Sequence, residues 1–150
     1  MNITIVGAGV YGSRIASKYK KTNAVKIKAV VSRHKPKSES FLSIPFYNSA
    51  KAWQKNFGLP GKNDVFDICV HHNILFGILE EFARIGGKNF ILPKPIALNK
   101  KDLLKIKQLS LRYKLNILVA SQWYYSKLVA EISDFVKKNR SEILKRINFS

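Results

Sequence analysis

Three glycines near the start of the chain constrain its fold more than any other feature. They have the spacing Gly7-x-Gly9-x-x-Gly12, follow an apolar run over residues 2–6, and open a segment with helical periodicity. In such a loop the first glycine permits a tight turn, the second lets the backbone approach a pyrophosphate, and the third lets the helix pack on the strand. The free N–H groups of the first helical turn would then meet the phosphate charge. The expected contact residues are Gly7, Gly9, Val10, Tyr11 and Gly12. The spacing predicts a dinucleotide site; S-adenosylmethionine, or a turn that merely needs glycines, are the alternatives.

Strand-like and helix-like segments alternate along the chain. Short apolar runs predict strands, with helices between them, at residues 2–6, 26–31, 44–47, 65–70, 89–92 and 116–120. Ser49 and Asn99 are expected to cap two of the helices, and a short helix is expected over residues 37–43 with Phe41 and Leu42 inward. This alternation predicts an α/β fold, a doubly wound parallel sheet of the Rossmann type in three layers, α/β/α.

The C-terminal segment does not continue this alternation of strands and helices. A helix is expected from Leu128 to Val136, after which residues 145–150 alternate like a new half-buried strand. We therefore expect residues 1–120 to form a dinucleotide-binding domain. Residues 121–150 are expected to form a connecting helix and the start of a further domain, so that the chain is part of a longer protein.

The residues after the second predicted strand indicate which dinucleotide binds. A site for NAD usually carries an acidic residue here to bind the ribose 2′-hydroxyl, whereas a 2′-phosphate requires cations. The chain reads Ser32-Arg33-His34-Lys35, and no carboxylate follows until Glu39. Ser32 and Arg33 suit a phosphate, so NADP is favoured over NAD. A solvated basic loop without a ligand is the alternative.

Composition narrows the classes of function. A net charge of +18 would suit a nucleic-acid binder, but lysines outnumber arginines by 21 to 6 and are scattered in pairs, so nucleic acid is the less favoured partner. The single cysteine, Cys69, excludes an internal disulfide framework, and the adjacent His71 and His72 have no third ligand nearby, so we expect no metal site. No membrane span or signal peptide is recognisable, and a cytoplasmic protein is expected.

Two further segments resemble a known family. Residues 89–98, Asn-Phe-Ile-Leu-Pro-Lys-Pro-Ile-Ala-Leu, resemble the segment that reads Glu-Lys-Pro and then Leu-Ala-Leu in the glucose–fructose oxidoreductase/inositol dehydrogenase (Gfo/Idh/MocA) family. Residues 119–126 resemble the segment after that family's sixth strand, and residues 71–73 stand where it has Thr-Pro-Asn. Residues 147–150 resemble the first strand of its C-terminal substrate domain. The resemblance covers the whole chain in order.

The resemblance implies an NAD(P)-dependent oxidoreductase that acts on a sugar, polyol or related small molecule. It places the family's catalytic lysine at Lys94, between nicotinamide and substrate. It places His71 and Asn73 along the path from pyrophosphate to nicotinamide, and Gln122 and Trp123 on the nicotinamide side. A separate C-terminal domain would bind the substrate, and homo-oligomers are expected.

The chain also departs from the family pattern. Pro93 replaces the glutamate before the lysine, Phe76 stands where the family has a histidine, and Tyr124 replaces an arginine. These changes fall on the catalytic side and leave the glycine loop intact. Three hypotheses therefore stay open: the NADP-binding half of an oxidoreductase, a non-catalytic dinucleotide-binding module, and a basic nucleic-acid-binding domain.

Overall fold

A computed structural model describes residues 1–121 and 127–139 of the chain. Its sheet has six parallel strands: β1 (Asn2–Val6), β2 (Lys26–Val31), β3 (Phe46–Tyr47), β4 (Asp64–Ile68), β5 (Asn89–Pro93) and β6 (Asn116–Ala120). The helices are α1 (Val10–Tyr19), α2 (Ala50–Phe57), α3 (His72–Arg84), α4 (Lys100–Tyr113) and α5 (Lys127–Lys138), with a short 3₁₀ helix η1 (Glu39–Phe41). The predicted Rossmann fold is confirmed.

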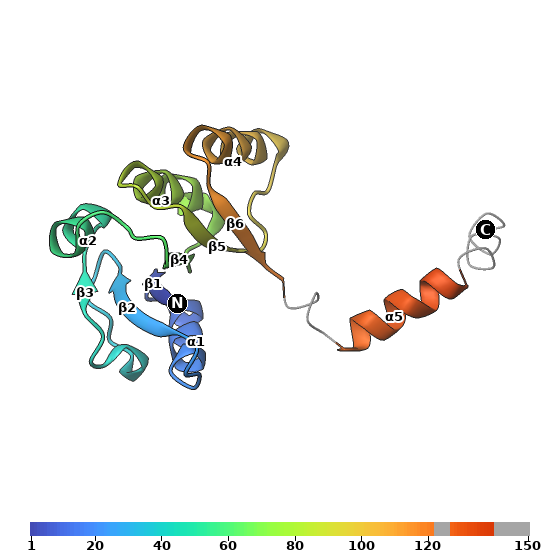
Figure 1. Cartoon of the computed structure of the whole chain (residues 1–150), viewed down its shortest axis with the longest axis horizontal. Helices are drawn as coiled ribbons and strands as arrows, with labels where there is room; N and C mark the ends of the chain where they lie inside the picture. The colour runs from blue at the N-terminus through green and yellow to red at the C-terminus, as the bar shows by residue number, and fades with distance from the viewer. Residues whose placement is uncertain (122–126, 140–150) are drawn as a thin grey trace. The chain divides into compact units, whose positions relative to one another are not determined.

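The order of the strands determines where a ligand can bind. Across the sheet the order is β3-β2-β1-β4-β5-β6, so the chain winds outward from β1 in one direction, returns, and winds outward from β4 in the other (Figure 1). All pairings are parallel. The carboxyl ends of the strands therefore lie along one edge, and the winding reverses between β1 and β4. In open α/β sheets this reversal point is where ligands bind.

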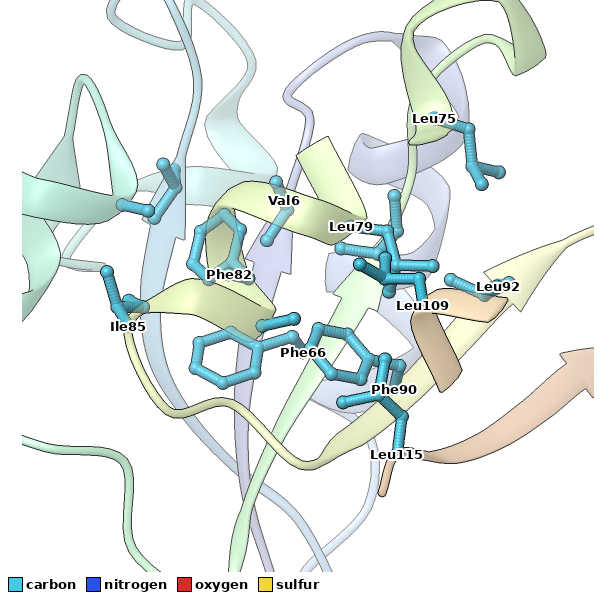
Figure 2. Packing of buried hydrophobic residues seen from close by; sticks show 14 of the residues in the cluster. Val6, Phe66, Leu75, Leu79, Phe82, Ile85, Phe90, Leu92, Leu109 and Leu115 are labelled. Atoms are coloured by element: carbon cyan, nitrogen blue, oxygen red, sulfur yellow. The ribbon is translucent and has the colours of Figure 1, made fainter. Parts of the chain in front are cut away.

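Most of the core lies on the face of the sheet that α2, α3 and α4 cover. Phe66 of β4 packs against Phe82 of α3 and Phe90 of β5, with ring centroids 4.7 and 5.6 Å apart (Figure 2). Trp53 of α2 is fully buried on the same face, and its indole N–H donates to the hydroxyl of Thr4 at 3.0 Å. Burial of these large rings is the main stabilising term for the domain.

The opposite face is covered by α1 over one half only. Ala16 of α1 packs with Ile3, Ile5 and Val30 of β1 and β2. Beyond β4, the described residues of Met1–Ala120 leave a broad depression of about 920 Å³ over β4, β5 and β6. The side chains of Val65, Ile91 and Leu118 line it, and Leu118 is 52% exposed.

Two local expectations were wrong. Residues 37–43 do not form an α-helix: only η1 is helical, and although Phe41 is buried as expected, Leu42 is 64% exposed. Ser38 accepts the amide of Ser40 and caps the start of this turn, and the backbone leaves the helical conformation at Leu42, where ψ is 137°. The segment is then too short to turn two adjacent apolar side chains inward. The expected strand over residues 145–150 lies outside the described residues.

The chain divides into two compact units, Met1–Ala120 and Ser121–Ser150. The described part of the second unit is α5, whose apolar side chains Ile132, Phe135 and Val136 are exposed. In the parts of the chain that the structure describes, every helix is too short or too polar to cross a lipid bilayer.

Candidate dinucleotide-binding site

Two of the three loop glycines are required by the backbone itself. Gly7 has a φ of +109°, and a Cβ built there would lie 2.5 Å from the carbonyl oxygen of Cys69. A Cβ on Gly12 would overlap the carbonyl oxygen of Gly7. Side chains other than hydrogen are therefore excluded at both positions by the fold, whether or not a ligand binds.

Gly9 is different, because the fold does not require it to be glycine. Its φ is −75°, which any residue can adopt, and no atom lies within 4 Å of a Cβ built there. It is the N-cap of α1, yet no side chain caps the helix and its first turn carries no acidic residue. The amides of Val10, Tyr11 and Gly12 have no acceptor within the helix, by the geometry of a helix start. The open space and the unused donors fit a pyrophosphate at this position.

Tyr11 stands on the first turn of α1 and is 44% exposed. Partial burial raises the pKa of its hydroxyl, and the nearby Cys69 and Asp67 raise it further. The phenol is thus neutral at physiological pH and brings no negative charge to the loop.

A cavity of about 360 Å³ opens beside the glycine loop, at the ends of β1 and β2. Gly7 lies at one side of it, and Ser32, Arg33 and His34 lie at another, as the sequence predicted for neighbouring parts of one site. The amide of Gly7 donates to the carbonyl of Val31 at 2.8 Å, which fixes the two strand ends together. Arg33 forms no ion pair within residues 1–121 and 127–139, so no carboxylate of this part of the chain neutralises its charge.

Glu81 lines the same cavity and was not predicted from the sequence. It projects from α3, and its Oε1 accepts the backbone amide of Ala50 at 3.2 Å, at the start of α2. The cavity therefore contains a carboxylate after all, although none follows β2 before Glu39. No local signal marks Glu81, because the contact joins residues that are 31 positions apart.

The remaining predicted residues are spread along the same edge. His71 is the N-cap of α3, directly after β4, and its ring lies 3.8 Å from that of His72. Asn73 lines a second cavity of about 390 Å³ between α3 and α4, apart from the glycine loop. Lys94 follows β5, is exposed, and precedes Pro95 across a cis peptide bond. Gln122 and Trp123 lie outside the described residues.

These strand ends lie next to one another along one edge of the sheet. Arg33 follows β2, Gly9 follows β1, His71 follows β4 and Lys94 follows β5, and these four strands are neighbours in that order. In a comparison with family models, residues 1–121 match the model described as an oxidoreductase family with an NAD-binding Rossmann fold. The chain belongs to the Gfo/Idh/MocA oxidoreductase family. The resemblance inferred from the Lys94 segment is thereby confirmed.

Solved structures share the fold of this Gfo/Idh/MocA chain. A candidate NADPH-dependent oxidoreductase from Desulfitobacterium hafniense is 17% identical in sequence, with a TM-score of 0.77. The match covers 93% of this chain and 40% of the oxidoreductase chain. Scyllo-inositol dehydrogenase from Lactobacillus casei, solved with NAD(H) and scyllo-inositol, is 18% identical with a TM-score of 0.73, covering 93% and 42%. The chain thus spans about two fifths of the length of these structures. No curated protein matches the sequence.

Proposed function

We propose that this chain is the NADP-binding domain of an oxidoreductase that acts on a polyol, a sugar or a related small molecule. One observation carries the proposal: the uncapped start of α1 at Gly9 lies two residues after Gly7, which lines the same cavity as Ser32 and Arg33. Donors for a pyrophosphate and a cation for a 2′-phosphate thus stand at adjacent strand ends. The polyol class rests on the inositol dehydrogenases among the structural neighbours.

Preference for NADP over NAD depends on the residues after β2. The Arg33 guanidinium is exposed at the cavity without an ion-pair partner among the described residues, and the Ser32 hydroxyl is half-buried beside it. A guanidinium and a hydroxyl together bind a dianionic phosphate well. The one carboxylate in the cavity, Glu81, already accepts the Ala50 amide, which leaves it less available to a ribose hydroxyl.

Lys94 is the residue that we assign to the reaction. When bound, the nicotinamide would supply the hydride chemistry. The Lys94 ammonium, two strands along from Gly9, would donate a hydrogen bond to the reacting oxygen of the substrate and move a proton at its Nζ. His71 and Asn73, with Gln122 and Trp123, would stand along the nicotinamide side. We assign the remaining substrate contacts to a further domain of the whole protein.

The test compares the affinities of the 150-residue chain for NADP and NAD by titration calorimetry. Arg33→Ala should weaken NADP binding by about 1–3 kcal/mol, the scale of a hydrogen bond to a charged group, and should leave NAD binding nearly unchanged. Arg14→Ala, which removes an exposed arginine of α1, is the matched control and should change neither affinity. Equal affinities for the two cofactors in both proteins would overturn the NADP preference, and no binding of either would overturn the proposed function.

A further inference from the structure

A buried carboxyl group lies beneath the glycine loop, on the α1 face of the sheet. Asp67 of β4 is only 3% exposed. The hydroxyl of Tyr19, at the end of α1, donates to its Oδ2 at 2.7 Å, and the thiol of Cys69 donates to its Oδ1 at 3.5 Å. The neighbours across the sheet are Ile5 of β1 and Ile91 of β5, neither of which titrates.

This carboxyl group has no cation beside it. Among the described residues no lysine, arginine or histidine pairs with Asp67. The titratable groups that face it are Tyr19 and Tyr11 from α1 and Cys69, directly after β4, and all three have a raised pKa. They remain neutral donors at physiological pH, so the described part of the chain offers Asp67 hydrogen bonds but no opposite charge. Burying an uncompensated carboxylate is costly.

Asp67 is linked to the loop through Cys69. The Cys69 amide donates to the carbonyl of Val6 at 2.6 Å, directly before the loop. Its carbonyl oxygen fills the space below Gly7, and its Cβ lies 3.5 Å from a Cβ built on Gly12. The charge of Asp67 also acts on Tyr11 in the first turn of α1. The carboxyl group therefore lies close enough to influence the turn whose amides face the proposed pyrophosphate.

We propose that Asp67 is a positioning residue of the glycine loop, and that dinucleotide binding makes it take up a proton. The inference rests on the proposed function, because the ligand is the dinucleotide. A pyrophosphate at the start of α1 brings negative charge toward a buried carboxylate that no cation screens. Like charges disfavour the ionised form, so the bound state favours protonated Asp67, which keeps its hydrogen bond with Tyr19.

The direction of the pH dependence follows. Burial raises the pKa of Asp67 above its ordinary value, while the hydrogen bonds from Tyr19 and Cys69 lower it in part. A bound pyrophosphate raises the pKa further. Affinity must then decrease as the pH rises through the pKa of the free protein toward that of the complex, because the complex binds more protons over that window.

The experiment measures proton uptake directly. Calorimetric titrations of the 150-residue chain with NAD⁺, in pairs of buffers with different ionisation enthalpies, give the protons taken up at each pH from about 5 to about 8. NAD⁺ is used because the 2′-phosphate of NADP itself titrates near a pH of about 6. Uptake should reach a sizeable fraction of one proton per cofactor bound.

Two variants assign the proton. Asp67→Asn removes the carboxyl group and keeps all three histidines, the other side chains that could take up a proton between these pH values. This variant should show no proton uptake and should bind NAD⁺ about three- to tenfold more tightly at neutral pH. Tyr19→Phe removes a hydrogen bond that favours the carboxylate, so the window of uptake should move to higher pH. Asp102→Asn, at an exposed acid of α4, is the matched control and should leave the uptake unchanged.

The outcomes separate the two proposals. Uptake that persists in Asp67→Asn, or a window that Tyr19→Phe leaves in place, would overturn the role of Asp67 while the dinucleotide site stands. Failure of the wild-type chain to bind NAD⁺ or NADP would overturn the proposed function and this inference together. A purely structural role for Asp67 would lower stability in the variants but would not move the proton uptake.

Discussion

Gly9 and Gly12 occupy the same loop, yet the structure gives them different reasons to be glycine. A Cβ on Gly12 overlaps the carbonyl oxygen of Gly7, whereas a Cβ on Gly9 meets nothing within 4 Å. The fold therefore requires glycine at position 12. At position 9 the fold leaves open space, and glycine keeps that space free. Substitutions at the two positions should separate stability from binding.

We expect Gly9→Val to abolish dinucleotide binding and to change the free energy of unfolding by less than about 1 kcal/mol, the scale of an N-cap change. The branched side chain would occupy the space left for a pyrophosphate. Gly12→Ala should instead destabilise the domain by about 1–3 kcal/mol or more, because helix and loop must separate to admit the methyl group. Urea denaturation and cofactor titration on both variants check the prediction. Binding by Gly9→Val at wild-type affinity would place the ligand elsewhere.

At the scale of the elements, the start of α2 has one contact that the sequence predicts and one that it does not. The Ser49 hydroxyl accepts the amide of Ala52 at 3.1 Å, as expected from a serine before a helical segment. The amide of Ala50, two residues earlier, donates to Glu81 of α3. The first contact is local and was predicted. The second depends on how α3 packs beside α2, and no pattern in the sequence encodes it.

Matched substitutions at Glu81 test this second cap. Glu81→Ala should lower the free energy of unfolding by about 1 kcal/mol, because the buried amide of Ala50 loses its acceptor at the start of α2. Glu81→Gln retains a side-chain oxygen that can accept the same amide and should recover most of that loss. Equal destabilisation by the two variants in urea denaturation would show that the carboxylate acts by its charge rather than as a cap.

The same distinction separates the correct and incorrect predictions for the other elements. The strands and the cap of α4 at Asn99 follow from apolar runs and turn residues, which are local. The expected helix over residues 37–43 was wrong because Ser38 caps the start of a single turn and the backbone is already non-helical at Leu42, where ψ is 137°.

At the scale of the whole molecule, the site is a consequence of topology. Ser32, Gly9, His71 and Lys94 belong to four separate segments, and they share an edge because the strands that precede them are parallel and adjacent. The glycine spacing and the family resemblance therefore predicted the residues at the strand ends. They could not predict Glu81, which lines the cavity from α3, or Asp67, which is buried in β4.

The core of the first unit closes without residues beyond the sheet. Both hydrophobic clusters consist of side chains from residues 3–117, and the glycine loop with its adjacent cavity lies within the same range. The ion pairs of α5, Lys127–Glu131 and Lys137–Asp134, are internal to that helix and exposed. Exposed pairs of this kind contribute little to stability. The two clusters and the cavity beside the glycine loop thus lie within the first unit.

We accordingly expect a chain that ends at Ser121 to unfold cooperatively, with a free energy of unfolding within about 1 kcal/mol of that of the 150-residue chain, because a compact unit with its own core folds independently. Its affinity for ADP-ribose, which lacks the nicotinamide, should also equal that of the longer chain. Phe82→Ala in the shortened chain is the control for sensitivity, since removing a ring buried to 1% exposure should cost about 3–5 kcal/mol. Urea denaturation followed by circular dichroism measures all three proteins. A shortened chain that is unfolded, or that loses several kcal/mol, would mean that residues 122–150 stabilise the domain, with the apolar surface around Leu118 as the first place to examine.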